Sequence, residues 1–235
     1  NRSKKKINLL QDRPYDFEIF RWSEEGYCLL VRIHHIIADM ETIWLLFNDI
    51  FKIYMSNEED IDFERTSYLS YCAESGIKEI TTLEYWKEKL DRKFLKYIDL
   101  NPDVKYKVFN ISAACMKEFK EFCVLHHATL FDGLLAVFSG ITNYLTGDRS
   151  IWISTSYSDR INDKSVNTYG MYIQNLLLNI KLSYKNSFIE LLNSVNSEVN
   201  ETLEKGELSI DDIARRLSIS TDISKLQSHI IFTFV

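Results

Sequence analysis

The pattern of apolar and polar residues changes its period near residue 40. Residues 27–38, which begin "YCLLVRIHHII", are apolar almost throughout, which predicts a strand covered on both faces. A second strand is predicted at residues 16–22, joined to the first by the turn "SEEG". From Glu41 the apolar residues recur every three or four positions, so the chain is predicted to form an amphipathic helix over residues 41–55, with Asp39 near its N-terminus.

Strands and helices continue to alternate along the rest of the chain. Helices are predicted at residues 67–74, 81–92, 112–127, 128–145, 188–206 and 212–217, and strands at residues 104–112, 150–160, 169–183 and 229–235. This order favours an α/β fold with a mixed sheet.

Composition narrows the possible partners of the chain. The 235 residues are 46% hydrophobic and carry a formal net charge of −6, so a sizeable core is possible and a basic surface for nucleic acid is not expected. The apolar runs are too short to span a bilayer and no signal peptide is visible, which predicts a cytoplasmic protein without a membrane partner. The four cysteines have no paired spacing and are predicted to be reduced core thiols.

Two adjacent histidines, His34 and His35, interrupt the apolar strand and are followed by Asp39. Successive side chains on a strand point to opposite faces, so one histidine is expected to be structural while the other opens into a cleft. The alternative is a pair of core histidines satisfied by backbone groups. No HExxH motif or Cys/His cluster accompanies the pair, so no metal site is predicted.

The segment "HHIIADM" resembles the HHxxxDG motif of the condensation domains of nonribosomal peptide synthetases, and other segments extend the likeness in the same order and spacing. These segments are "RPYDFEIF", "SYLSYCAE" followed by "EYWKEKL", "HATLFDGLLAVFSGITNYLTGDRSIWISTSYSDR", "YGMYIQNLLLNI" and "HIIFTFV". The "DFGWG" signature of plant-type acyltransferases is absent. Cyclisation domains, which have aspartates in place of both histidines, are disfavoured, and an epimerisation domain is a minor alternative.

The resemblance implies a chloramphenicol-acetyltransferase-like α/β fold of two lobes arranged as a V, with mixed sheets. Residues 1–80 would be the later part of the N-terminal lobe, which carries the motif, and residues 81–235 most of the C-terminal lobe. The N-terminal lobe would be incomplete in this sequence.

The resemblance also implies an acyltransferase that forms amide bonds between carrier-bound thioesters. His35 matches the catalytic histidine, and His34, Asp39 and Arg160 match structural positions, with Arg160 as the partner of Asp39. Asn175 matches an asparagine that lines the substrate tunnel. No cofactor is expected on this chain, because 4′-phosphopantetheine arms come from donor and acceptor peptidyl carrier proteins. An adjacent adenylation domain is the other expected partner.

Met40 departs from the motif, which has glycine at this position. Glycine there would permit a positive φ or a close approach of the acyl donor, so methionine is expected to strain the backbone or narrow the donor side of the tunnel. An active domain with an unusual donor pocket is therefore one reading. A degenerate domain that docks carriers or another enzyme is a second, and a free-standing acyltransferase that uses coenzyme A thioesters is a third.

Overall fold

A computed structural model describes most of the chain and divides it into two compact units. The described residues are 6–56, 63, 65–75, 80–90, 106–160, 163–183, 185–205, 213, 215–217 and 230–234. Unit 1 comprises residues 1–77 and 158–173, and unit 2 comprises residues 78–157 and 174–235. The lobes implied by the resemblance, residues 1–80 and 81–235, stay a prediction; in the division observed here the segment 158–173 belongs to unit 1.

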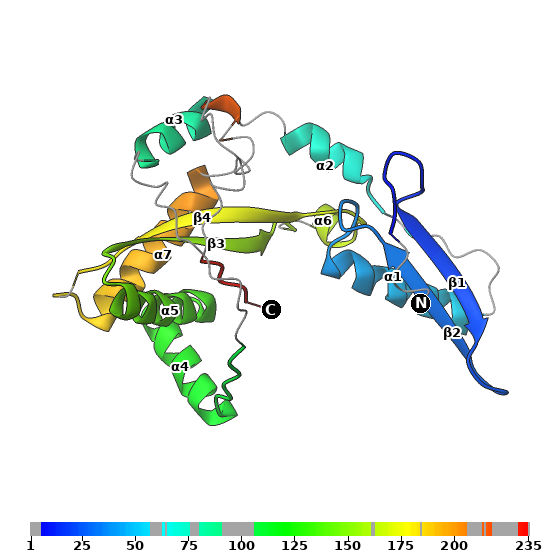
Figure 1. The fold of residues 1–235 in the computed structure, drawn as a ribbon, viewed down its shortest axis with the longest axis horizontal. Coiled ribbons are helices and arrows are strands. Elements are labelled where there is room, and N and C mark those ends of the chain that lie inside the picture. The colour runs from blue at the N-terminus through cyan, green and yellow to red at the C-terminus, as the bar shows by residue number, and fades with distance from the viewer. Residues whose placement is uncertain are drawn as a thin grey trace. The chain divides into compact units, whose positions relative to one another are not determined.

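Unit 1 is built on a β-hairpin and a long helix (Figure 1). Strand β1 (Tyr15–Arg21) pairs antiparallel with β2 (Tyr27–Ile33), in a register that places Tyr15 opposite Ile33 and Arg21 opposite Tyr27. The helices of this unit are α1 (Met40–Met55), α2 (Tyr68–Ser75) and the short α6 (Asp163–Val166). The predicted helix over 41–55 is therefore confirmed, and Asp39 is its N-cap residue.

The strand predicted over residues 27–38 is too long, because β2 ends at Ile33. The backbone N–H of His34 still donates to the Pro14 carbonyl at 2.7 Å, and the N–H of Ile37 then closes a turn onto the His34 carbonyl at 3.1 Å. Ile36 and Ile37 made the segment resemble a buried strand, but both side chains are exposed. The histidine pair therefore lies in the loop after the strand and not on the strand itself.

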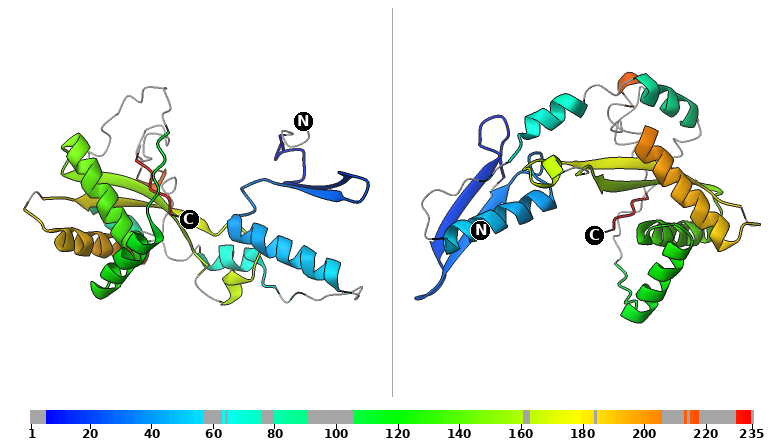
Figure 2. Two further views of the ribbon diagram at one scale, coloured as in Figure 1. Left: turned by 90° about the horizontal axis from the view of Figure 1, so that it is seen from below. Right: turned by 180° about the vertical axis from the view of Figure 1, so that it is seen from behind.

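Unit 2 places a two-stranded sheet between helices (Figure 2). Strand β3 (Ser150–Ser158) pairs with β4 (Ile173–Lys181), and α4 (Ala113–Leu125), α5 (Leu130–Thr146) and α7 (Phe188–Lys205) complete the larger core. Alternate strand residues, such as Ile153 and Leu178, join the cluster formed with α5 and α7. Their neighbours Trp152 and Leu177 point the other way and pack with Trp86 of α3 (Ile80–Lys89). Both faces of this sheet are thus covered by helices.

Two strand predictions in unit 2 are wrong or only partly realised. Residues 106–112 of the strand predicted at 104–112 are exposed and form no strand, and residues 104 and 105 lie outside the described chain. Of the strand predicted at 229–235, residues 229 and 235 lie outside the described chain, and residues 230–234 contribute a single bridge, Ser154 to Ile231, with hydrogen bonds of 2.9 Å on either side. A pattern of β-forming residues becomes a strand only where neighbouring backbone groups complete the ladder.

The cysteine prediction needs correction, because the four thiols are free but are not all in a core. Cys123 is buried, whereas Cys72 and Cys115 are exposed.

None of the helices described here could span a bilayer alone, judged by its length and apolar content. Helices α4 and α5 reach that length and composition only as a pair, across a bend of 102°.

Candidate active site

The loop between β2 and α1 presents His35 to solvent in a defined orientation. The side chain is exposed, and its Nδ1 lies 2.8 Å from the carbonyl oxygen of Ala38. A carbonyl oxygen can only accept, so Nδ1 carries the proton and the Nε2 of the neutral ring keeps a free lone pair. His35 is therefore held in the tautomer that can accept a proton at its outer nitrogen.

His34 is turned inward to the backbone of the same loop. Its Nδ1 accepts the backbone N–H of Ile36 at 3.1 Å, and its own N–H is bound to Pro14. In the neutral ring this leaves the proton on Nε2, the opposite arrangement to that of His35. The two adjacent imidazoles are thus distinguished by the backbone groups that they contact.

Asp39 is buried at the start of α1 and accepts hydrogen bonds from three other residues. Its Oδ1 accepts the N–H of Thr42 at 2.8 Å, which caps the helix, and its Oδ2 accepts the N–H of Tyr172 at 3.1 Å. Arg160 donates Nη2 to Oδ1 at 2.9 Å and Nε to Oδ2 at 3.2 Å. Burial acts to raise the pKa of Asp39, but the hydrogen bonds from Arg160 and Thr42 outweigh it, so the pKa lies below its ordinary value.

Arg160 is the centre of the buried network in unit 1. Its side chain is only 2% exposed, and it reaches a second carboxylate, Glu41, with Nε at 2.9 Å from Oε2. Its Nη1 donates to the carbonyls of Ser165 and Thr168 at 2.6 and 2.7 Å. The guanidinium carbon also lies 4.2 Å from the ring centre of Tyr172. The structure places Arg160 and Asp39 in contact, the pairing that the motif resemblance implied, and adds partners that the resemblance did not indicate.

Met40 is the first residue of α1, and its side chain is 61% exposed. Among the described residues the only non-glycine residue with a positive φ is His127, so the backbone at Met40 is not strained. The expectation of strain at this position is wrong because the helix begins here and any L-residue can adopt its backbone geometry. What methionine introduces at this position is the bulk of its side chain.

Asn175 lies on β4 in unit 2, with an exposed side chain. Its place in a substrate tunnel stays a prediction.

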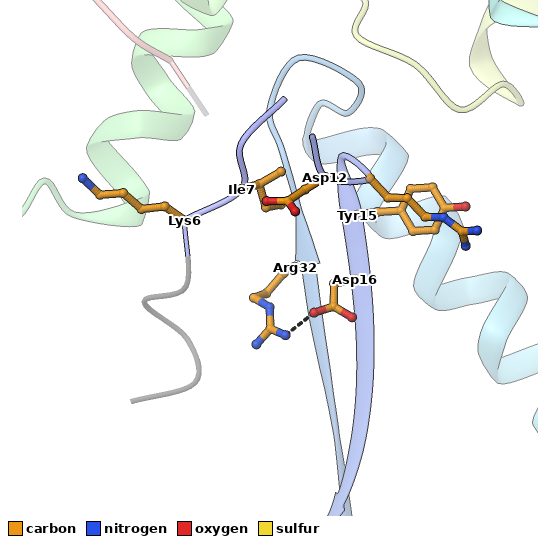
Figure 3. A pocket seen from close by; sticks show the side chains of 7 residues that line it. Lys6, Ile7, Asp12, Tyr15, Asp16 and Arg32 are labelled. Carbon is orange, nitrogen blue, oxygen red and sulfur yellow. Dashed lines mark hydrogen bonds and ion pairs between the residues drawn. The ribbon is translucent and has the colours of Figure 1, made fainter. Parts of the chain in front are cut away.

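A pocket of about 220 Å³ in unit 1 does not involve either histidine of the loop. It is lined by Lys6, Ile7, Asp12, Arg13, Tyr15, Asp16 and Arg32 (Figure 3).

No metal centre emerges from the part of the chain that the structure describes, where no three or more His, Cys, Asp or Glu side chains are arranged to hold an ion. His35 is held by a backbone carbonyl, and the Asp39–Arg160 network lies behind its loop. The loop therefore combines an exposed imidazole with a buried ion pair.

Comparison with known proteins identifies the family. The sequence model of the condensation domain family matches residues 1–234. One of the plipastatin synthase subunits of Bacillus subtilis (strain 168) is 23% identical over 236 residues, which span 94% of this chain and 9% of that protein. The chain belongs to the condensation domain family.

Solved structures agree with this assignment at the level of the fold. A four-domain nonribosomal peptide synthetase, holo-AB3403 bound to AMP and glycine, matches with a TM-score of 0.78 at 19% identity, over 99% of this chain and 19% of that one. The X-domain in its complex with OxyB from teicoplanin biosynthesis matches with a TM-score of 0.73 at 17% identity, over 94% of this chain and 53% of that one. The predicted chloramphenicol-acetyltransferase-like α/β fold is confirmed. The chain spans about half the length of the matched X-domain and less than a tenth of the plipastatin synthase protein.

Sequence reasoning missed three residues that hold the site together: Thr42, Gly170 and Tyr172. Gly170 and Tyr172 lie more than 120 residues from the loop, and their contacts use mainly backbone groups. One local signal existed for Thr42, because the side chain of an aspartate N-cap accepts the backbone N–H of the residue three positions later.

Proposed function

We propose that this chain carries the catalytic histidine of a condensation domain, which joins two acyl groups held as thioesters on carrier proteins. The observation that carries the proposal is the hydrogen bond from His35 Nδ1 to the Ala38 carbonyl, which leaves Nε2 free at an exposed position. Membership of the condensation domain family supports the same reaction.

The reaction needs one proton acceptor beside two tethered substrates. The amine nitrogen of the acceptor attacks the thioester carbonyl carbon, a C–N bond forms, and the C–S bond breaks. The amine proton passes to His35 Nε2 or is held by it, and the departing sulfur of the donor arm takes up a proton. Bringing two tethered reactants together supplies much of the rate.

Partners and location follow from this reaction. The donor and acceptor would be peptidyl carrier proteins that bring their own 4′-phosphopantetheine arms, with an adenylation domain next to them in a cytoplasmic assembly. Similarity to the plipastatin synthase protein and to the four-domain synthetase supports such an arrangement.

The test is amide formation between two carrier proteins loaded with a panel of aminoacyl thioesters, with the full-length protein as enzyme. His35→Ala is expected to lower the rate by about a hundredfold or more, since general base catalysis contributes on that scale. His34→Ala serves as the matched control and is expected to affect stability more than rate. A His35→Ala protein that is folded and as active as the wild type would refute the proposal.

A second candidate role is a docking platform that does no condensation chemistry. Met40 favours it, because an exposed methionine stands where the motif has glycine. The likeness to an X-domain that was solved in complex with OxyB also supports it. Met40→Gly separates the two roles: amide formation that appears only in this variant would favour docking, whereas activity in the wild type would favour catalysis. Coenzyme A thioesters offered in the same assay test the free-standing acyltransferase.

A further inference from the structure

Thr42 is buried in the first turn of α1, where its hydroxyl makes three hydrogen bonds. It donates to the Gly170 carbonyl at 2.7 Å and accepts the Gly170 N–H at 3.0 Å. It also accepts Arg160 Nη2 at 2.9 Å. A hydroxyl has one proton and two lone pairs, so every hydrogen-bonding position of this side chain is used.

Gly170, which is hydrogen-bonded to Thr42, is packed closely against Tyr68 on the side where a Cβ would point. A Cβ added to Gly170 would lie 2.2 Å from the nearest ring atom of Tyr68, so the glycine backbone is enclosed between Tyr68 and Thr42. The Tyr68 hydroxyl donates to the carbonyl of Met171, the next residue, at 2.7 Å. The Gly170 carbonyl additionally accepts the N–H of Asp39 at 3.4 Å.

These contacts lead directly to the imidazole of His35. The Ala38 carbonyl that holds Nδ1 is joined by a peptide bond to Asp39. Asp39 is fixed in turn by the Thr42 N–H, by Arg160 and by the Gly170 carbonyl. A shift at the start of α1 would therefore move the acceptor that sets the His35 tautomer.

We propose that Thr42 is a positioning residue for His35. Its hydroxyl joins Gly170 and Arg160 to the first turn of α1, which keeps the Ala38 carbonyl in place and leaves His35 Nε2 free. The inference rests on the proposed function of His35. Removing the hydroxyl takes from the buried Gly170 N–H its hydrogen bond to Thr42 and from the Gly170 carbonyl its shortest hydrogen bond. The carbonyl then keeps only the longer contacts from Asp39 N–H at 3.4 Å and Arg160 Nη2 at 3.3 Å, so the loop is expected to shift.

The test compares Thr42→Ser, which keeps the hydroxyl, with the nearly isosteric Thr42→Val in the full-length protein. Thr202→Val is the matched control. Thr202 is also buried, and its hydroxyl lies 3.2 Å from Tyr85 Oη and 3.1 Å from Lys89 Nζ in unit 2. Nitrogen-15 NMR of the histidine side chains reports the His35 tautomer without any substrate, and carrier-to-carrier amide formation gives the rate.

Thr42→Val is expected to lose about tenfold or more in rate and to mix the two His35 tautomers, because small displacements of a reacting group are costly. Thr42→Ser is expected to retain the rate and the single tautomer, and Thr202→Val to lower Tm without changing either. The proposal is overturned if Thr42→Val, measured well below its Tm, keeps the wild-type rate and tautomer. If His35→Ala is itself active, the proposed function fails, while the NMR measurement still decides whether Thr42 orients the ring.

Discussion

At the scale of the residue, the candidate site consists of an exposed imidazole and a buried ion pair, which have different roles. His35 reaches solvent, whereas Asp39 and Arg160 are both buried. Burial of both charges is tolerated because nearly every polar atom has a partner. The chemistry and the stability of the loop are therefore assigned to different side chains.

Asp39→Ala is expected to destabilise unit 1 by roughly 3–5 kcal/mol, since it removes one partner of a buried ion pair. Urea unfolding at pH 7 would measure this loss. Asp39→Asn is the matched control, because it keeps the shape and removes the charge. A well-folded and inactive Asp39→Ala protein with unchanged unfolding free energy would contradict this account.

The same carboxylate predicts how stability varies with pH. The pKa of Asp39 is lower in the folded state than in the unfolded chain, where it is about 3.9. Its contribution is therefore complete above about pH 4 and is lost as the pH falls through the folded value. The unfolding free energy of the wild type should drop more steeply below pH 4 than that of Asp39→Asn. Parallel curves for the two proteins would show that Asp39 does not contribute in this way.

At the scale of the element, helices were predicted better than strand ends. The helix expected at 41–55 is observed at Met40–Met55, because its apolar period and its aspartate cap are local signals. The end of β2 was missed because Ile36 and Ile37 are apolar yet lie in an exposed turn. Residues 106–112 look like a strand in sequence, but a strand also requires hydrogen-bond partners from distant parts of the chain.

The difference between local and long-range signals also explains which parts of the candidate site could be predicted. A motif resemblance pointed to His34, His35, Asp39 and Arg160. The histidine tautomers were not predicted, because they depend on which backbone groups the loop turns toward. Thr42 joins Gly170 across 128 residues of sequence, and no local pattern reveals such a contact.

The close packing of α4 on α5 gives a prediction for Gly133. A Cβ at this position would lie 2.3 Å from Cys123 Sγ and 3.0 Å from the ring of Phe119. Gly133→Ala is expected to cost about 1–3 kcal/mol through overpacking, despite the better helix propensity of alanine. In a Cys123→Ala background the same change should be neutral or stabilising. Thermal unfolding of the four proteins measures the coupling, and an equal effect in both backgrounds would rule out this contact as the cause.

At the scale of the whole molecule, the two units are stabilised by different kinds of interior. The buried residues described in unit 1 are mainly polar or charged: Asp39, Thr42, Asp49, Arg160, Ser165 and Thr168. Unit 2 instead has a continuous apolar cluster that includes Leu135, Ile153, Leu178 and Leu192. Burial of apolar surface is the larger source of stability, and it does not depend on a hydrogen-bond partner for each buried atom.

Unit 1 is therefore expected to open before unit 2. Hydrogen exchange followed by mass spectrometry at pH 7, with increasing urea, should show α1 losing protection at a lower denaturant concentration than α5. Both are long helices with a capping side chain, so each serves as an internal reference for the other. Simultaneous loss of protection in both helices would mean that the two units unfold as one.

The return of residues 158–173 to unit 1 also has a consequence for biosynthesis. Asp39 and its arginine are separated by 121 positions in the sequence, and residues 78–157 between them belong to the other unit. At about 5–20 residues per second, a ribosome needs roughly 6–24 s to bring the arginine out after the aspartate. During that interval Asp39 has emerged but lacks its counter-ion, so the nascent chain completes this ion pair only after the first half of unit 2 has been translated.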